Sequence, residues 1–137
     1  MEKTLFTIGY GNRTPAVLVG MLRDADVDVI DIRNYGTKAW CQAYWGKNIC
    51  ETLKPMRCHR LGVFGNACST LNAYHGRLAQ DAFVNDQLLL FAKLIGNGFY
   101  KHPCLLCAEI DPARCHRSIL AEGLIKRLGA DWFVKHL

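Results

Sequence analysis

The chain has 137 residues, 50% of them hydrophobic and 21% charged, with a formal net charge of +5. This size and composition are ordinary for a soluble globular protein, so we predict one domain over residues 1–137. No window approaches the roughly 18 apolar residues of a membrane span, which excludes a membrane helix, and the scattered basic residues favour phosphate-bearing partners over a basic nucleic-acid arm.

The cysteines indicate the cellular compartment. Seven of them are scattered along the chain, and this odd number fits poorly with the fully paired framework of a secreted protein. We therefore expect reduced thiols and a cytoplasmic protein.

The first predicted strand covers residues 4–8 and breaks at a glycine-containing turn, residues 9–13. Thr14, which precedes a proline, is then the expected cap of a helix. The turn joins a strand to a helix, as a phosphate loop does, so Asn12 and Arg13 are candidate anion ligands. The alternative is that the glycines only permit the turn and Asn12 bonds its own backbone.

The second predicted strand covers residues 27–32. Asp31 and Arg33 stand at its end, two residues apart, so that their side chains point to one face. Arg33 could bind an anion while Asp31 holds it or acts as a base, or the two could form a purely structural ion pair. Residues 34–48 are dense in aromatic residues and lysines, which could stack bases or simply anchor a lid by burial.

The remaining chain alternates between helix and strand patterns. We predict a short helix over residues 49–56, a third strand over 58–65, a loop over 66–80, a packed helix over 83–94 and a final strand over 131–137.

Residues 103–118 carry most of the candidate chemistry. The first half is an apolar run typical of a buried strand, and Asp111 followed by a proline is typical of a helix start. Free N–H groups in the first turn of a helix attract anions, and Arg114 and Arg117 crowd this end, so both are candidate anion ligands. They could instead pair on the surface with Asp111 and Glu109.

The same stretch resembles the signature of the domain of unknown function 488 family. The matching residues are Cys107, Glu109, Asp111, Pro112, Cys115, His116 and Arg117. Residues 7–13 and 31–33 are similar to two further motifs of that family, in the same order along the chain. The resemblance implies an α/β domain and does not specify a reaction. The aromatic segment 34–48 departs from the more polar sequence usual in the family.

The order of elements predicts an α/β fold. We expect a single three-layer domain with a mainly parallel sheet of about five strands and helices on both faces. Because such sheets bind ligands at the carboxyl ends of their strands, the segments 9–13, 31–33 and 107–117 should form one anion site.

The cysteines of this site allow two kinds of chemistry. Cys115 lies among cations near a helix start and Cys107 ends a strand, so either could be the nucleophile of a phosphatase-like or sulfur-transfer enzyme. Both could equally be small buried hydrophobes. We expect no metal site, because Cys104 and Cys107 are three residues apart on a strand and point to opposite faces.

Acid and base chemistry is the third possibility. Glu109, Asp31 and His116 could act as acid and base on a nucleotide or nucleic-acid substrate held by the arginines. The competing hypothesis is a binding module that holds the same phosphate-bearing ligand without chemistry. No cofactor is predicted.

Overall fold

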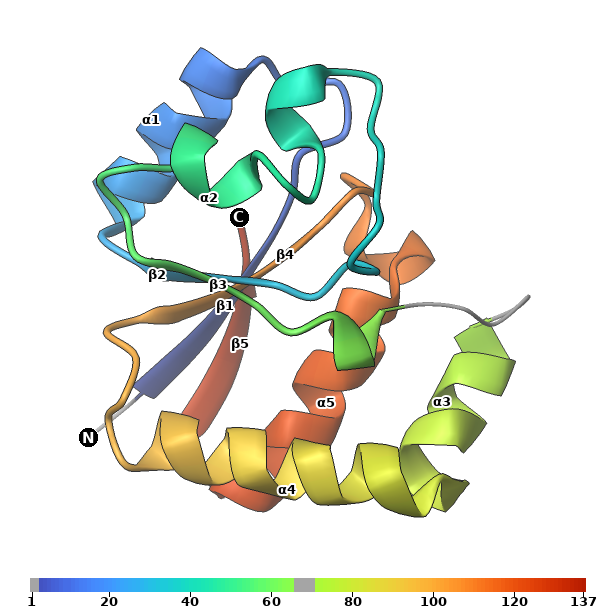
Figure 1. Ribbon diagram of the computed structural model, residues 1–137. Coiled ribbons are helices and arrows are strands. Elements are labelled where there is room, and N and C mark those ends of the chain that lie inside the picture. The colour runs from blue at the N-terminus through green and yellow to red at the C-terminus, as the bar shows by residue number, and fades with distance from the viewer. Residues whose placement is uncertain (1–2, 66–70) are drawn as a thin grey trace.

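The computed structural model describes residues 3–65 and 71–137. Its centre is one sheet of five parallel strands in the order β3-β2-β4-β1-β5 (Figure 1). The strands are β1 (Lys3–Gly9), β2 (Asp28–Asp31), β3 (Cys58–Arg60), β4 (Pro103–Cys107) and β5 (Trp132–His136). The prediction of an α/β fold with a parallel sheet of about five strands is therefore confirmed.

Helices cover both faces of this sheet (Figure 1). One face carries α1 (Pro15–Ala25) and α2 (Ile49–Thr52), and the other carries α3 (Leu71–Gln80), α4 (Ala82–Gly96) and α5 (His116–Leu128). Short 3-10 turns occur at η1 (Gln42–Tyr44), η2 (Gly62–Phe64) and η3 (Pro112–Arg114). Within the described residues, no helix is both long and apolar enough to cross a membrane.

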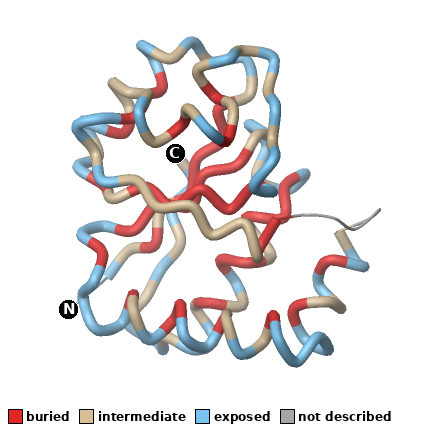
Figure 2. Tube along the Cα trace, viewed as in Figure 1, coloured by how far each residue is buried: buried red, intermediate tan, exposed pale blue. Residues whose placement is uncertain are grey.

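The central strand β4 is buried along its whole length (Figure 2). Cys104 and Leu106 pack into the cluster under α1 and α2, whereas Leu105 and Cys107 pack into the cluster under α3, α4 and α5. A parallel strand covered on both faces explains the uninterrupted apolar run in the sequence. It also confirms that Cys104 and Cys107 point to opposite faces.

The loop predicted over residues 66–80 is wrong from residue 71 onward, because α3 begins there. The buried residues of this helix are Tyr74 and Leu78, four positions apart, and polar residues are interspersed with them at Asn72, His75, Arg77 and Gln80. One buried pair on a polar helix is a weak periodic signal, which is why the sequence pattern resembles a loop. Residues 66–70 of that predicted loop lie outside the described residues.

The helix after β4 also starts later than predicted. Asp111 caps only the 3-10 turn η3, where its Oδ1 accepts a hydrogen bond from the N–H of Ala113 at 2.9 Å. The backbone is then extended at Cys115, and α5 begins at His116 with Cys115 as its N-cap. Cys115 and His116, rather than Ala113, therefore stand at the start of the long helix. The third predicted strand is likewise shorter, since η2 follows β3 after one residue.

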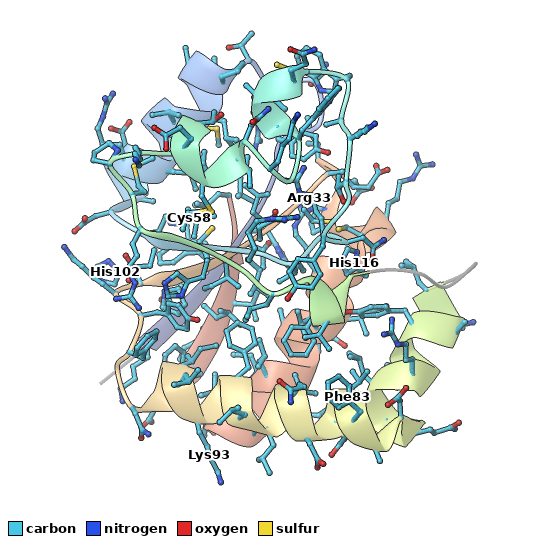
Figure 3. All side chains as sticks on the ribbon, viewed as in Figure 1. Arg33, Cys58, Phe83, Lys93, His102 and His116 are labelled. Carbon is cyan, nitrogen blue, oxygen red and sulfur yellow. A yellow bond between two sulfur atoms is a disulfide. The ribbon has the colours of Figure 1, made fainter. Side chains whose placement is uncertain are left out.

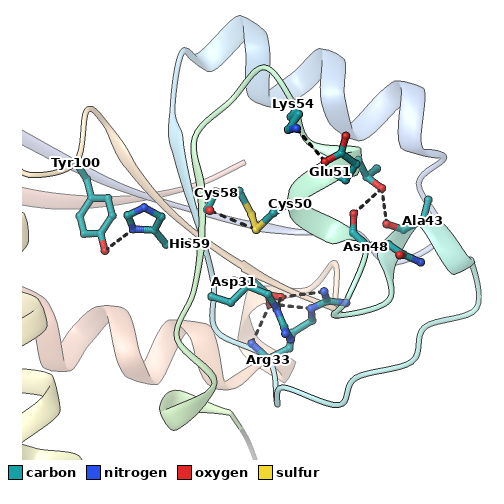
Figure 4. Close-up of a disulfide and its surroundings, with 12 residues drawn as sticks. Asp31, Arg33, Ala43, Asn48, Cys50, Glu51, Lys54, Cys58, His59 and Tyr100 are labelled. Carbon is teal, nitrogen blue, oxygen red and sulfur yellow. Dashed lines mark hydrogen bonds and ion pairs between the residues drawn. A yellow bond between two sulfur atoms is a disulfide. The ribbon is translucent and has the colours of Figure 1, made fainter.

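One pair of cysteines is bonded. Cys50 of α2 and Cys58 of β3 form a disulfide, with Cα atoms 5.1 Å apart, because the chain turns back between these elements (Figure 4). The expectation of reduced thiols is therefore wrong for this pair. The free cysteines of the described residues are Cys41, Cys104, Cys107 and Cys115.

The strand order places a switch point between β2 and β4. From β2 the chain continues to β3 at one edge of the sheet, whereas from β4 it continues through α5 to β5 at the other edge. Connections that leave neighbouring strands in opposite directions open a crevice at the carboxyl ends of those strands.

The connection that follows β4 crosses the end of β1. The N–H of Tyr10 donates to the carbonyl of Cys107 at 3.1 Å, and the N–H of Gly11 donates to the carbonyl of Ala108 at 2.7 Å. A Cβ atom on Gly9 would lie 1.7 Å from the carbonyl oxygen of Glu109. Only glycine permits this close backbone approach.

Gly9→Ala should therefore lower the free energy of unfolding by about 3 kcal/mol, the upper part of the range for overpacking, because the opposing atom is backbone. Urea denaturation measures this change. The matched control is Gly20→Ala in α1, where a new Cβ meets nothing within 4 Å. That control should keep or gain up to about 1 kcal/mol, and equal stabilities of the two variants would contradict the prediction.

Candidate functional site

A pocket of about 260 Å³ opens at the switch point. Arg33, Asn34 and Thr37 line it on the side of β2, and residues 107–109 and 114–116 line it on the side of β4 and α5. Figure 3 shows Arg33 and His116 in the region where the connections after β2 and β4 meet. The predicted site residues of these two connections that line the pocket are Arg33, Cys107, Glu109, Arg114, Cys115 and His116.

A larger hollow, of about 460 Å³, lies at the opposite end of the strands. It is lined by the start of β1, the end of α4 and the residues before β4, with Lys3, Tyr100 and His102 as polar groups. Parallel sheets bind ligands at the other, carboxyl end. The smaller pocket is therefore the candidate site.

His116 contacts both cysteines of the pocket. Its Nδ1 lies 3.5 Å from Sγ of Cys107 and 3.8 Å from Sγ of Cys115, while its Nε2 lies 3.2 Å from the carbonyl oxygen of Ile32. A carbonyl only accepts, so Nε2 carries a proton, and Nδ1 is the ring nitrogen that faces the two sulfur atoms. The ring edge of Tyr74 packs against the imidazole, with the ring centres 5.0 Å apart.

The environment separates the two thiols. A hydrogen bond from Cys107 lowers the pKa of the Cys115 thiol, and His116 and the backbone N–H of Arg117 lower it further, although burial opposes them. The same hydrogen bond, together with burial, raises the pKa of the Cys107 thiol. Cys115, whose sulfur also receives the backbone N–H of Arg117 at the start of α5, is therefore the better placed of the two thiols to carry a negative charge. Burial also raises the pKa of Cys104, which lies on the other face of β4.

These three residues are also suited to bind a metal ion. Sγ of Cys107, Sγ of Cys115 and Nδ1 of His116 all lie within 4.8 Å of one another. Cys104 points away from them, as the sequence predicts. The sequence argument against a metal site concerned a ligand set that included Cys104, and the set found here does not include it.

Asp31 is fully buried and committed to arginines (Figure 4). Its Oδ1 accepts from the N–H and Nε of Arg33 at 3.0 and 2.8 Å, and its Oδ2 accepts from Nη2 of Arg33 and Nε of Arg60, both at 3.0 Å. Asp31 does not line the pocket. Of the two hypotheses for this residue, the geometry favours the structural ion pair over the base.

Arg33 is 4% exposed and lines the pocket. Besides its bonds to Asp31, its Nη1 donates to the carbonyl of Tyr44 at 2.5 Å, and its guanidinium lies 5.2 Å from the ring centre of Tyr10. Burial would lower the pKa of Arg33, but the hydrogen bonds and charge of Asp31 outweigh it and raise the pKa. Arg33 thus places a permanent positive charge on the wall of the pocket, and Asp31 largely neutralises this charge.

Arg117 is fully buried and bonded within the protein. Its Nε donates to Oγ1 of Thr7 at 3.1 Å, its Nη2 to the carbonyl of Ile110 at 2.9 Å, and its Nη1 to the carbonyl of Glu109. Arg117 does not line the pocket. The arrangement favours a structural role, in which it fixes the connection after β4, over the predicted contact with an anion.

The exposed charges of the pocket are Arg114 and Glu109. Arg114 reaches the solvent because the 3-10 turn η3 projects it away from the core. It is therefore the predicted anion ligand that a substrate can reach most directly. Glu109 keeps its carboxylate exposed while its backbone carbonyl binds Arg117.

Asn12 and Arg13 do not line the pocket. Arg13 donates through Nη1 to the carbonyl of Gly9 at 2.8 Å, and its own carbonyl accepts from the hydroxyl of Tyr44 at 2.5 Å. Nε1 of Trp40 covers the same turn by donating to the carbonyl of Gly11 at 2.6 Å. The aromatic segment after β2 thus folds over the turn where we expected an anion to bind.

The sequence analysis missed some residues that build the site. Arg60 shares Asp31 with Arg33, and Tyr74 packs against His116. The spacing of Tyr74 and Leu78 is the signal that could have identified α3. No local signal marks Arg60, because its partner lies 29 positions away.

A scan against protein-family models, a search of curated proteins and a search of solved structures each found no match to this chain. Membership of the domain of unknown function 488 family therefore stays a prediction from the sequence motifs.

Arg117→Met should destabilise the fold by about 3 kcal/mol, because it removes the donor of the buried hydroxyl of Thr7 and of the carbonyls of Glu109 and Ile110. Arg114→Met is the matched control on the exposed turn and should stay within about 0.5 kcal/mol of the wild type. Urea denaturation of both variants measures the difference. Equal stabilities would mean that Arg117 is not a structural anchor.

His136 should make the stability depend on pH. The hydroxyl of Thr7 contacts Nδ1 of His136 and accepts a hydrogen bond from Nε of Arg117, so the positive charge of Arg117 lies close to the imidazole. Burial and the charge of Arg117 lower the pKa of His136 below its ordinary value of about 6.5. The unfolded chain then binds this proton first, so this contribution to stability is complete above about pH 6.5 and is lost as the pH falls through the lower, folded-state value.

His136→Asn keeps an acceptor for Thr7 and cannot be protonated. As the pH falls from about 7.5 to 5, the unfolding free energy of the wild type should therefore decrease relative to that of this variant. A difference that is constant over this range would show that His136 titrates alike in the folded and unfolded states.

Proposed function

We propose that the protein is a thiol-dependent enzyme that acts on a small phosphate-bearing molecule in the pocket between β2 and β4. The observation that carries the proposal is the contact of Nδ1 of His116 with the sulfur atoms of Cys107 and Cys115 on the pocket wall. A thiol beside an imidazole whose second nitrogen is fixed by another group is the arrangement of an activated cysteine nucleophile.

Cys115 is the proposed nucleophile. Its sulfur caps α5 and accepts the N–H of Arg117 at 3.5 Å, and both features stabilise a thiolate. Cys107 faces the same pocket but donates to Cys115, which makes it the supporting thiol.

The reaction balances as a displacement at phosphorus. The sulfur of Cys115 supplies the electron pair of the new S–P bond, the P–O bond to the leaving group breaks, and the leaving oxygen keeps that pair. His116 takes the thiol proton and gives it to the leaving oxygen. Water then attacks phosphorus, the S–P bond breaks, and phosphate and the free thiol are released.

The size and charge of the pocket support a small anionic group. At about 260 Å³ the pocket is smaller than the roughly 300–1,000 Å³ usual for whole ligands, so it suits one phosphate group with the rest of the molecule outside. Arg114 supplies an exposed positive charge on its wall.

A binding module for nucleotides is the second candidate. Tyr35 is 59% exposed between the pocket residues Asn34 and Thr37, with the guanidinium of Arg60 5.4 Å from its ring centre. An exposed aromatic ring beside an anion pocket can stack a base. A nucleotide that stabilises wild type and Cys115→Ser equally, without turnover by either, would favour this candidate.

Cys115 should be alkylated faster than the other thiols. In a Cys41→Ser/Cys68→Ser background, iodoacetamide should label Cys115 first, as located by peptide mapping, and His116→Gln should slow this labelling about 100-fold. The same variants are assayed with a chromogenic phosphate ester, and Cys115→Ser should abolish its hydrolysis. Cys104→Ala, on the opposite face of β4, is the control and should change neither rate. Labelling of Cys115 as slow as that of Cys104 would overturn the proposal.

The pocket should also prefer an anionic reagent. In the wild-type chain, the ratio of the labelling rate with iodoacetate to the labelling rate with iodoacetamide should be higher at Cys115 than at Cys41. Arg114→Ala should lower this ratio about fivefold, because one charge near 4 Å in water is worth about 1 kcal/mol. Arg127→Ala, at the exposed far end of α5, is the matched control. An unchanged ratio in Arg114→Ala would remove Arg114 as the anion ligand.

A further inference from the structure

The spacing of three side chains in the pocket matches a metal site. In a tetrahedral zinc site, bonds of about 2.3 Å to sulfur and 2.0–2.1 Å to nitrogen place a sulfur and a nitrogen ligand about 3.5–3.6 Å apart. Nδ1 of His116 lies 3.5 Å from the sulfur of Cys107 and 3.8 Å from that of Cys115. Both sulfur–nitrogen distances are therefore within a few tenths of an ångström of the values for a shared ion, and all three ligand atoms lie within 4.8 Å of one another.

The surrounding groups hold these ligands in the required state. The carbonyl of Ile32 accepts a hydrogen bond from Nε2 of His116 and so leaves Nδ1 as the coordinating atom. A backbone carbonyl in this position is a usual outer partner of a metal-bound histidine. The backbone N–H of Arg117 points at the sulfur of Cys115. All three ligands are at most 6% exposed, so the packing around them restricts their movement.

The ligand types select the ion. Two thiolates and an imidazole favour thiophilic ions such as Zn²⁺ over Mg²⁺ or Ca²⁺, which prefer oxygen ligands. Three protein ligands leave the fourth tetrahedral position open, and here the ligands border the pocket that contains Arg114. A water molecule or a small anion can therefore complete the coordination.

We propose that Cys107, Cys115 and His116 bind one Zn²⁺ ion per chain, and that the bound ion blocks the thiol chemistry of Cys115. The binding itself stands on the geometry alone, whereas the block rests on the proposed function. Coordination releases the thiol protons and uses the electron pair of the Cys115 sulfur in the bond to zinc. The Zn²⁺ ion also withdraws charge from the remaining lone pairs of that sulfur and occupies the space beside it, so zinc would regulate the same site.

The direct test is Co²⁺ binding to the full chain, after reduction and treatment with a chelator. Tetrahedral Co²⁺ with thiolate ligands gives sulfur-to-cobalt charge-transfer absorption, which should saturate at one ion per chain and disappear when Zn²⁺ is added. Cys107→Ser/Cys115→Ser should remove the absorption, and His116→Gln should weaken the affinity while some of it remains. Cys104→Ala is the matched control, because this buried cysteine faces the other side of β4 and should have no effect. Circular dichroism verifies that each variant is folded.

No absorption from the folded wild type, or absorption that persists in the double serine variant, would overturn the metal site. A second measurement separates this result from the proposed function. Zn²⁺ should protect Cys115 from iodoacetamide in the wild type, and a chelator should restore the labelling. If the protein binds metal but Cys115 is unreactive in the metal-free state, the proposed function is contradicted and the metal site stands. If Cys115 is reactive but no metal binds, the metal site is contradicted and the proposed function stands.

Discussion

The buried guanidinium of Arg117 holds together the carboxyl edge of the sheet. From the first turn of α5 it reaches Thr7 of β1 and the carbonyls of Glu109 and Ile110, so that one side chain joins a helix, a strand and the connection between β4 and α5. A buried charge is stable only when its donors are satisfied, which is why the connection must follow one path across the end of β1. Gly9 permits that path because it has no Cβ atom.

This fixed path determines the geometry of the reactive groups. Cys107 ends β4, and Cys115 and His116 return to it only because the intervening residues close into the 3-10 turn η3 before α5 begins. His116 is then oriented by a carbonyl of the neighbouring β2 chain and by Tyr74 of α3. The imidazole therefore presents Nδ1 to two sulfur atoms, which is the pre-organisation that both thiol chemistry and metal binding require.

The charges of the site divide into two groups with different roles. Asp31 pairs with the buried Arg33, where an unpaired charge would be costly, and with the partly exposed Arg60, and this cluster ties the residues after β2 to β3. Arg114 stands on an exposed turn at the mouth of the pocket. A substrate anion can displace water from such an arginine at little cost, whereas it would have to break existing bonds to reach Arg117.

The sequence by itself determined the α/β fold, the five strands and the opposite directions of Cys104 and Cys107, because these follow from local periodicity and from the two-residue repeat of a strand. It also identified Cys107, Cys115, His116 and Arg114 as candidates, since strand ends and helix starts carry ligand sites in such sheets. Only the tertiary structure decided which arginines are already bonded, that His116 faces both thiols, and that Arg60 shares Asp31. Each of these facts depends on at least one partner far away in the sequence, 29 positions for Arg60 with Asp31, 84 for His116 with Ile32 and 110 for Arg117 with Thr7. A local pattern cannot show whether the donors of a side chain are satisfied by residues so distant in the chain, because the packing of the whole sheet brings them together.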